Sequence, residues 1–380
     1  MANTYYTWMY KEKDIQAVHF LLDTITSLRK YMPASGKPVK DPPGDPSNDW
    51  LYYTYIAQGY KLVVGYDPSR INPSDVYGLL GLSPGDVSLT VGKPFKIMPA
   101  QQTMCGFRCN PYRPVLSGID IFGCCDGCNC PQAACTLGFI AYKGNEVGIV
   151  SANHCIYGTI CGSSMSSCVP YNKYVIQPST ICGGSCPNNV IAEDAITYDF
   201  GTGDWLVDGA WARLTTPSRW AVLDENAVIK DLPTAAKARD PTLGEPIAKY
   251  GRGVYTFSTR QSTVQGIGAS VTVCCPQGTC FNFVDQIVTG QGYMSEGDSG
   301  SGTFSLLNAD PIGLNFAGDA DTGIGVMARA LNVEKYLGIT IASTASPLSL
   351  TSATPIPYYL LLAGLAGAGA LTGFALAHTI

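Results

Sequence analysis

The strongest constraint on the fold is a succession of short β-type runs, separated by glycine, asparagine and proline turns, that fills most of the chain after residue 111. Glycine supplies 42 of the 380 residues, and Thr, Ser and Tyr are abundant, as in strands joined by tight turns. This texture predicts a mainly β protein built as a sandwich or a barrel. Typical runs are Leu137–Tyr142, Val147–Ser151, Val264–Cys274 and Ile312–Ala317.

Composition and charge exclude several classes of protein. Apolar residues make up 46% of the chain and charged residues 14%, whereas a disordered chain combines low hydrophobicity with high charge. The formal net charge is −5, whereas phosphate binding needs clustered Lys and Arg, so we expect no nucleic-acid partner. The nearest phosphate-type loop, Gly251-Arg252-Gly253, lacks a third glycine and a following helical pattern. It therefore predicts no dinucleotide cofactor, and Arg252 is interpreted as an ordinary solvated residue.

Residues 1–104 predict a small α+β domain. Apolar residues recur at helical spacing over 14–32, which predicts one amphipathic helix. A linker rich in Pro, Gly and Asp over 33–48 separates this helix from two strand-like segments, Trp50–Gly65 and Val87–Ile97. We expect the helix to pack on its own domain, and contact with a membrane surface or with another copy is the alternative.

The C-terminal region has a different texture. Residues 356–377 contain no charge, and the apolar run Tyr358–Ala377 is long enough to cross a hydrocarbon core of ~30 Å as a helix. We therefore expect a transmembrane anchor after a Ser/Thr/Pro-rich stalk at 343–355, with a buried helix of a soluble domain as the alternative. The spacing of Gly369 and Gly373 permits helix pairing in the membrane, which leaves a homo-oligomer open.

The chain contains 15 cysteines, a high and odd number, gathered in clusters at 105–135, 155–186 and 274–280. Disulfides are the first interpretation, and they place the protein outside the cell or in a hyperthermophile whose interior tolerates them. Zinc is the alternative, at Cys125 and Cys128 or at Cys182 and Cys186, although neither pair has a well-spaced second pair or a nearby histidine. Together with the anchor, the cysteines predict a protein on the external face of a membrane, in a thermophilic microbe or its virus.

Two distant segments carry candidate chemistry. His154 is the one histidine of three that lies in the β-rich region, at the turn that ends a strand-like run. Ser299 lies in Gly297-Asp298-Ser299-Gly300, where flanking glycines predict a tight turn with an exposed hydroxyl. The N–H groups of Gly297 and Ser299 can converge there on a developing oxyanion. Because a serine hydroxyl alone is a poor nucleophile, His154 would take its proton.

The third member of such a site is a buried carboxylate that orients the histidine. Asp208 is the best candidate because it leads directly into a strand with alternating apolar residues. Asp199 and Asp204 are the other candidates, and neither precedes such a strand. The chain order is then His, Asp, Ser, which disfavours a nucleophile-elbow hydrolase.

These motifs resemble those of the trypsin-like, chymotrypsin-fold serine peptidases over about residues 113–341. Val150–Cys155 is similar to the family's histidine motif with Asn153 in place of an alanine, Asp208–Leu214 to its aspartate motif, and Gly297–Gly300 to its serine motif. The similarity is greatest to a microbial branch with a small N-terminal domain.

The resemblance implies a peptidase domain over 105–342 with a Cys-rich entrance and two six-stranded β-barrels. The triad His154, Asp208 and Ser299 would lie in the cleft between the barrels. It also implies endopeptidase activity on polypeptides through an acyl-enzyme, a Cys135–Cys155 disulfide, and neither cofactor nor metal.

The specificity pocket departs from the family. Tyr293 stands where a trypsin-type enzyme has its pocket-floor aspartate, so cleavage after Lys or Arg is not implied, and Glu296 would lie at the pocket mouth. Phe316 and Ala317, followed by Gly318, replace the usual Ser-Trp on the strand that docks substrate. No family-like cleavage site precedes the barrel, so Asp298 needs a partner other than a freed α-amine.

We therefore expect a membrane-anchored serine endopeptidase with a Ser-His-Asp triad. The altered pocket positions leave an alternative, a catalytically silent binding or structural protein of a cell surface or virion on the same fold. An esterase would share the triad chemistry.

Overall fold

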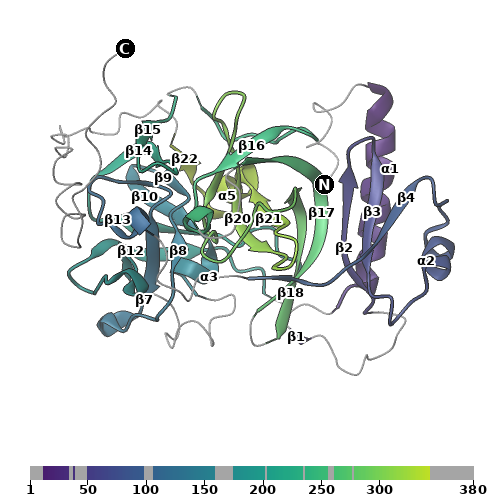
Figure 1. The fold of residues 1–380 in the computed structure, drawn as a ribbon, viewed down its shortest axis with the longest axis horizontal. Coiled ribbons are helices and arrows are strands. Elements are labelled where there is room, and N and C mark those ends of the chain that lie inside the picture. The colour runs from purple at the N-terminus through teal and green to yellow at the C-terminus, as the bar shows by residue number, and fades with distance from the viewer. Residues whose placement is uncertain are drawn as a thin grey trace, which may run out of the picture. The chain divides into compact units, whose positions relative to one another are not determined.

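The computed structural model describes residues 12–33, 37–38, 49–97, 106–158, 174–201, 203–233, 236–255, 261–275 and 278–342 (Figure 1). The predicted stalk at 343–355 and anchor at 356–377 lie outside the described residues. Within the described ranges, no helix has both the length and the apolar character needed to cross a membrane.

Part of the largest sheet, which has 11 strands, closes on itself. β17 pairs with β16 and with β18, and the ring is completed through β21, β20 and β19, so these strands form a six-stranded barrel. All residues of β20 are buried, as expected for a strand with the core on one side and packed chain on the other. The barrel strands are β16 (Pro246–Lys249), β17 (Gln261–Cys274), β18 (Thr279–Thr289), β19 (Gly302–Ser305), β20 (Pro311–Gly318) and β21 (Gly325–Arg329).

The N-terminal strands continue this sheet. β17 has 14 residues and is long enough to pair with β2 as well as with its barrel neighbours. β3 and β4 follow β2 outward, and α1 packs against β2 and β17 (Figure 1). The described elements on both sides belong to one compact unit, Met1–Leu348, and the predicted boundary near residue 104 lies outside the described residues. The elements are α1 (Glu12–Leu28), a 3-10 turn (Arg29–Tyr31), β1 (Lys37–Pro38), β2 (Leu51–Ala57), β3 (Lys61–Tyr66), α2 (Pro73–Leu80) and β4 (Val87–Val91).

The apolar face of α1 is covered by the chain itself. Val18, Ile25 and Leu28 are at most 3% exposed and share a core with Trp50 and Ile56. Fully burying one such aliphatic side chain stabilises the fold by about 1.5–3 kcal/mol, so this face holds the helix on the sheet.

A short strand, β5 (Phe95–Lys96), connects the N-terminal elements to the barrel. It pairs in parallel with the end of β17 and antiparallel with β20, where Lys96 lies opposite Gly318. The amide of Ile97 donates to the carbonyl of Cys274, which extends the pairing by one residue. The chain therefore already lies along the end of β20, the strand predicted to dock substrate.

The second sheet has 8 strands and carries the histidine motif. A separate, smaller sheet has 3 strands. α5 (Ala330–Leu337) packs on β20 and β12 and so contacts both large sheets; it ends at Gly338, whose φ of 63° favours glycine. In spatial order the 8 strands are β22 (Thr340–Ile341), β9 (Phe139–Lys143), β10 (Glu146–Ser151), β13 (Ala210–Leu214), β12 (Val190–Thr197), β11 (Tyr174–Ile176), β7 (Asp120–Cys124) and β8 (Cys135–Thr136). The 3-stranded sheet consists of β15 (Ile229–Asp231), β14 (Ser218–Leu223) and β6 (Val115–Ser117). The short helices are α3 (Asn153–Ile156) and 3-10 turns at Gly106–Cys109, Asp126–Cys128, Thr180–Cys182 and Arg252–Tyr255.

Disulfides account for the clustered cysteines of the described chain. Besides the five pairs given below, Cys125 and Cys275 are also disulfide-bonded. All four cysteines considered for zinc lie in disulfides, so the disulfide interpretation is confirmed. Several disulfides indicate an extracellular or secreted protein. The pairs are Cys109–Cys182, Cys124–Cys130, Cys128–Cys186, Cys135–Cys155 and Cys274–Cys280.

The predicted mainly β class is confirmed, and its barrel-like sheets fit a chymotrypsin-like fold. The closed ring of β16–β21 corresponds to one of the two expected barrels. The cysteine next to the histidine motif forms the expected bond to Cys135.

Gly148→Ala should destabilise the fold by about 1–3 kcal/mol, because a Cβ at this point of β10 would lie 2.5 Å from the carbonyl oxygen of Ala212 and would collide with the Trp211 ring. Chemical denaturation measures the change in the free energy of unfolding. Gly78→Ala in α2 is the control, because nothing lies within 4 Å of its Cβ position, and it should stabilise by up to about 1 kcal/mol. Equal effects at both glycines would contradict the packing argument.

Candidate active site

The strand register brings the histidine and aspartate motifs together. β10 and β13 pair with Ser151 opposite Ala210, so the residues just beyond β10 lie beside the residues just before β13. The chain turns at Ala152 into α3, whose second residue is His154. The Cys135–Cys155 disulfide fixes the same turn to β8.

Asp208 is the candidate carboxylate that lies at His154. Its Oδ2 is 2.6 Å from His154 Nδ1, its Oδ1 accepts the main-chain N–H of His154 at 3.2 Å, and both side chains are fully buried. Of the two other candidates, Asp199 accepts the amide of Gly201 and Asp204 pairs with Arg29. A carboxylate that holds both the ring and the main chain can fix the tautomer with the proton on Nδ1.

The opposite ring nitrogen is left without a partner. His154 Nε2 is buried and makes no hydrogen bond within the described chain. The Ser299 hydroxyl is also buried and donates to the carbonyl of Phe316 at 3.4 Å rather than to His154. Of the predicted triad, the structure thus shows the Asp208–His154 bond, while the Ser299 hydroxyl is bonded to a main-chain carbonyl.

The serine turn packs against the end of the histidine strand. Gly300 has a φ of 82°, and a Cβ there would lie 2.6 Å from the carbonyl oxygen of Thr136 and would clash with Ser151 Oγ. Only glycine allows this approach. The turn carrying Ser299 therefore reaches the main chain just before His154.

Thr136 on β8 binds this turn from the second sheet. Its N–H donates to Ser299 O at 2.9 Å and its hydroxyl to Gly297 O at 2.7 Å, while the hydroxyl oxygen accepts the amide of Arg252 at 2.9 Å. The carbonyls of Gly297 and Ser299 are thus both fixed. Among the described residues, neither of their N–H groups donates to a main-chain carbonyl, so both are available to an oxyanion.

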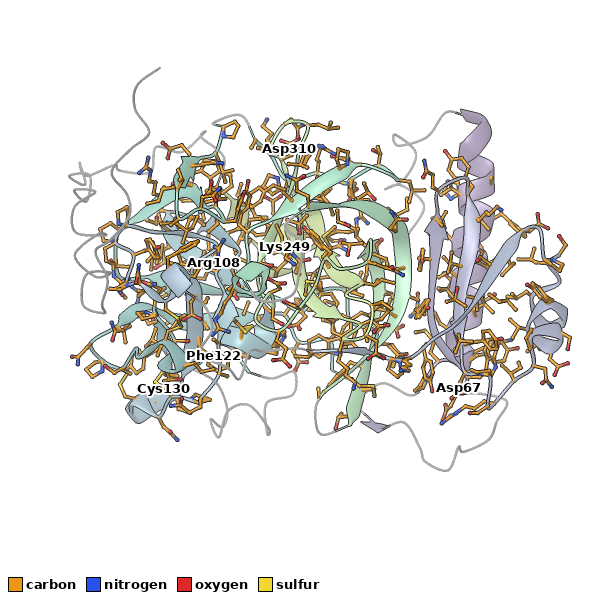
Figure 2. The ribbon with its side chains drawn as sticks, viewed as in Figure 1. Asp67, Arg108, Phe122, Cys130, Lys249 and Asp310 are labelled. Atoms are coloured by element: carbon orange, nitrogen blue, oxygen red, sulfur yellow. A yellow bond between two sulfur atoms is a disulfide. The ribbon has the colours of Figure 1, made fainter. Side chains whose placement is uncertain are left out.

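Asp298 finds its partner within the chain, in a buried lysine of β16. Lys249 is labelled in Figure 2. Its Nζ lies 2.7 Å from Asp298 Oδ2, and neither side chain is exposed to solvent. The amides of Gly253 and Ser295 donate to the two oxygens of the same carboxylate at 2.9 and 3.0 Å. Burial lowers the pKa of the Lys249 ammonium, and Asp298 opposes that shift. The burial of Lys249 was not predicted, because a single lysine in a short strand gives no signal of burial.

A second buried ion pair joins the two sheets. Arg252 Nε lies 2.9 Å from Asp120 Oδ1, and the amide of Ser179 donates to Asp120 Oδ2 at 2.6 Å. Burial raises the pKa of Asp120 to about 6, against the opposing effect of Arg252. The expectation of a solvated Arg252 was wrong: the residue is 2% exposed, because β7 supplies a carboxylate that the local sequence does not show.

The predicted pocket residues have diverse surroundings. Tyr293 is fully buried, with its hydroxyl 2.9 Å from Thr303 Oγ1 and its ring centroid 4.5 Å from Lys249 Nζ. The ring of Phe316 packs on Phe283 with centroids 4.6 Å apart. Ala317 and Gly318 are buried in β20, and Glu296 is exposed. Their role in specificity stays a prediction.

One group of potential metal ligands occurs among the described residues, made of Cys135, His154 and Cys155. The two sulfurs are bonded to each other, so they offer no thiolate to a metal ion. The chemistry that the site can perform is that of a serine, an imidazole and a carboxylate.

No family model matches the sequence, and no curated protein is similar to it. Several solved structures are similar. A glutamic acid specific serine protease is 21% identical, with 60% of this chain and 100% of that chain covered and a TM-score of 0.42. Thermobifida fusca protease A is 18% identical, with 60% and 98% covered and a TM-score of 0.39. The Nocardiopsis protease is 17% identical, with 60% and 99% covered and a TM-score of 0.40.

These neighbours are chymotrypsin-fold bacterial serine proteases. The motifs resemble the same class.

Asp120→Asn should change the pH dependence of stability. Because the pKa of Asp120 rises from 3.8 to about 6 on folding, the folded state binds more protons than the unfolded state between these pH values. The contribution of Asp120 to the free energy of unfolding therefore falls as pH rises, by about 3 kcal/mol in total. Chemical denaturation of wild type and Asp120→Asn from pH 4 to 7 should show a difference in the free energy of unfolding that shrinks as pH rises.

Asp231→Asn is the control for this measurement. Arg219 lowers the pKa of the exposed Asp231 below its ordinary value of 3.8, so the wild-type-minus-variant difference should stay flat between pH 4 and 7. A flat difference for Asp120→Asn as well would contradict the raised pKa.

Proposed function

We propose that this chain is a serine endopeptidase of the chymotrypsin-like type, with Ser299 as nucleophile, His154 as general base and Asp208 as the orienting carboxylate. The observation that carries the proposal is the buried His154–Asp208 bond, which leaves Nε2 unpartnered next to the serine turn. A histidine with one nitrogen fixed by a carboxylate and the other free is arranged to accept a proton.

In the proposed reaction, Ser299 Oγ attacks the carbonyl carbon of a peptide bond and its proton passes to His154 Nε2. The developing imidazolium is stabilised by Asp208, which stays ionised. Collapse of the tetrahedral intermediate transfers the proton from Nε2 to the leaving amine and leaves an ester on Ser299. Water, deprotonated by the same nitrogen, then hydrolyses this ester.

The N–H groups of Gly297 and Ser299 serve as the oxyanion hole. Their availability and the fixed carbonyls of the same residues support this role, because preorganised donors cost no reorganisation during reaction. The ion pair with Lys249 holds Asp298, which lies between Gly297 and Ser299. The conformation of the serine turn therefore depends on Lys249 of β16.

Polypeptides are the proposed substrates, docked in extended form along β20 at Phe316, Ala317 and Gly318. Tyr293 and Glu296 would set preference at the pocket. Since β5 already pairs at Gly318, a substrate strand that extends to this residue must share the end of β20 with the chain's own segment.

The disulfides support a location outside the cell. Anchoring in a membrane by residues 356–377 and assembly through that segment are proposals from the sequence alone. A catalytically silent surface or virion protein would keep the same fold without an activated serine.

Labelling of the full chain with a fluorophosphonate probe tests the proposal. Wild type should be labelled at Ser299, and both Ser299→Ala and His154→Ala should abolish labelling. Asp208→Asn should slow it by about 10³- to 10⁴-fold, because the imidazole loses its fixed tautomer. Ser301→Ala, a change of the serine two residues further along the chain, should still be labelled. Folded wild type that stays unlabelled would favour the silent protein.

Lys249→Arg should move the loss of labelling at alkaline pH to higher pH. Burial lowers the pKa of Lys249, so its ammonium loses its proton earlier than a surface lysine would, and Asp298 then lacks a cation. A guanidinium stays charged across this range. Labelling rates against pH measure the shift.

Lys249→Met is the companion variant. It should lose labelling at all pH values, because removing one partner of a buried pair costs about 3–5 kcal/mol. An unchanged alkaline limb in Lys249→Arg would contradict this role for Lys249.

A further inference from the structure

The residue before His154 is a buried amide. Asn153 is 0% exposed and is the first residue of α3, and the amides of Tyr157 and Gly158 both donate to its carbonyl. The family that the motif resembles has an alanine at this position, which would bury no polar group. Burying an amide costs free energy unless its hydrogen bonds to water are replaced. The Asn153 side chain therefore needs hydrogen-bond partners within the protein.

The side chain of Asn153 donates to Thr197. Its Nδ2 lies 2.8 Å from Thr197 Oγ1, and that hydroxyl in turn donates to the carbonyl of Gly209 at 2.7 Å. Thr197 is the last residue of β12 and pairs with Ala210. The hydroxyl therefore sits where the strand already brings it next to the segment that follows Asp208.

Two connections then run side by side between the same two segments. One consists of the two bonds that Asp208 makes to His154, at the ring and at the main-chain N–H. The other runs from Asn153, just before the histidine, through Thr197 to Gly209, just after the aspartate. Attachments at two successive residues of each segment restrain rotation of one segment about the other more than attachments at one residue do.

We propose that Asn153 and Thr197 are positioning residues that fix the register of the His154–Asp208 pair. The inference deepens the proposed function and rests on it for its catalytic meaning, but the geometry it describes exists whether or not the serine reacts. Neither residue touches the reacting atoms. Their effect passes through the main chain at positions 154 and 208.

The effect on the pair follows from distance and angle. A short N–H···O bond to a carboxylate weakens steeply when its angle departs from linear. Without the Asn153–Thr197–Gly209 connection, the two segments can slide, and the bond from Nδ1 lengthens for part of the time. The proton on Nδ1 then exchanges with water more readily, and the imidazole is less often oriented toward Ser299.

Proton NMR of the full chain tests this directly, because the chain has only 3 histidines and His154→Gln assigns the resonance. Wild type should show a downfield Nδ1 proton of His154 that exchanges slowly. In Asn153→Ala and in Thr197→Val, this proton should exchange at least about tenfold faster, and fluorophosphonate labelling should slow by about tenfold, as expected for one lost hydrogen bond.

Two further variants separate positioning from general stability. Thr197→Ser keeps the hydroxyl and should retain the wild-type resonance. Thr272→Val removes another buried hydroxyl, which donates to Asn282 Oδ1 at 3.0 Å in the β17–β18 pair, and should lower stability without changing the resonance. Because the connection is one unit, the double variant Asn153→Ala/Thr197→Val should be no worse than either single variant.

The outcomes are distinct. A protected Nδ1 proton and unchanged labelling in both Asn153→Ala and Thr197→Val would overturn the inference, as would the same loss in Thr272→Val. If wild type shows the protected proton, loses it in the two variants and yet is never labelled, the positioning role stands and the proposed peptidase activity fails.

Discussion

Thr136 is the residue through which the serine turn depends on the second sheet. Its N–H and its hydroxyl hold the carbonyls of Ser299 and Gly297, and its own carbonyl accepts the hydroxyl of Ser151 at 2.8 Å. The neighbouring Cys135 is bonded to Cys155, next to the histidine. One short strand, β8, thus sets the position of the serine turn and of the histidine turn together. A shift of one sheet against the other would displace both the serine turn and the histidine turn.

The charges around the site are buried at a cost. Taking Lys249 and Asp298 or Arg252 and Asp120 out of water is repaid only if the geometry is good and the remaining hydrogen bonds are made. Main-chain amides donate to the carboxylate of each pair, from Gly253 and Ser295 to Asp298 and from Ser179 to Asp120. Apolar residues of similar volume would often stabilise a fold as well. The proposed oxyanion hole requires a turn held in place, and the bonds to Asp298 hold this turn.

The sequence predicted those features that local patterns encode. The β texture, the helix near residues 14–32 and the choice of Asp208 over Asp199 all follow from spacing, and the β10–β13 register puts Asp208 at His154 as that choice requires. Lys249 and the Asp120–Arg252 pair were not predicted, because a buried charge is defined by partners far away in sequence. The same holds for β2, whose pairing with β17 joins the N-terminal elements to the barrel. Strand periodicity does not identify the neighbour of a strand.

The contacts that complete the site have a consequence for how the chain folds. Thr136 and Gly297 are 161 residues apart, His154 and Asp208 are 54 apart, and Asp298 pairs with Lys249 of another strand, β16. Loops of this length close late, after local structure has formed. A partly folded chain therefore lacks the His154–Asp208 bond and the bonds of Thr136 to the serine turn. For the proposed peptidase, the site would be assembled only in the folded chain.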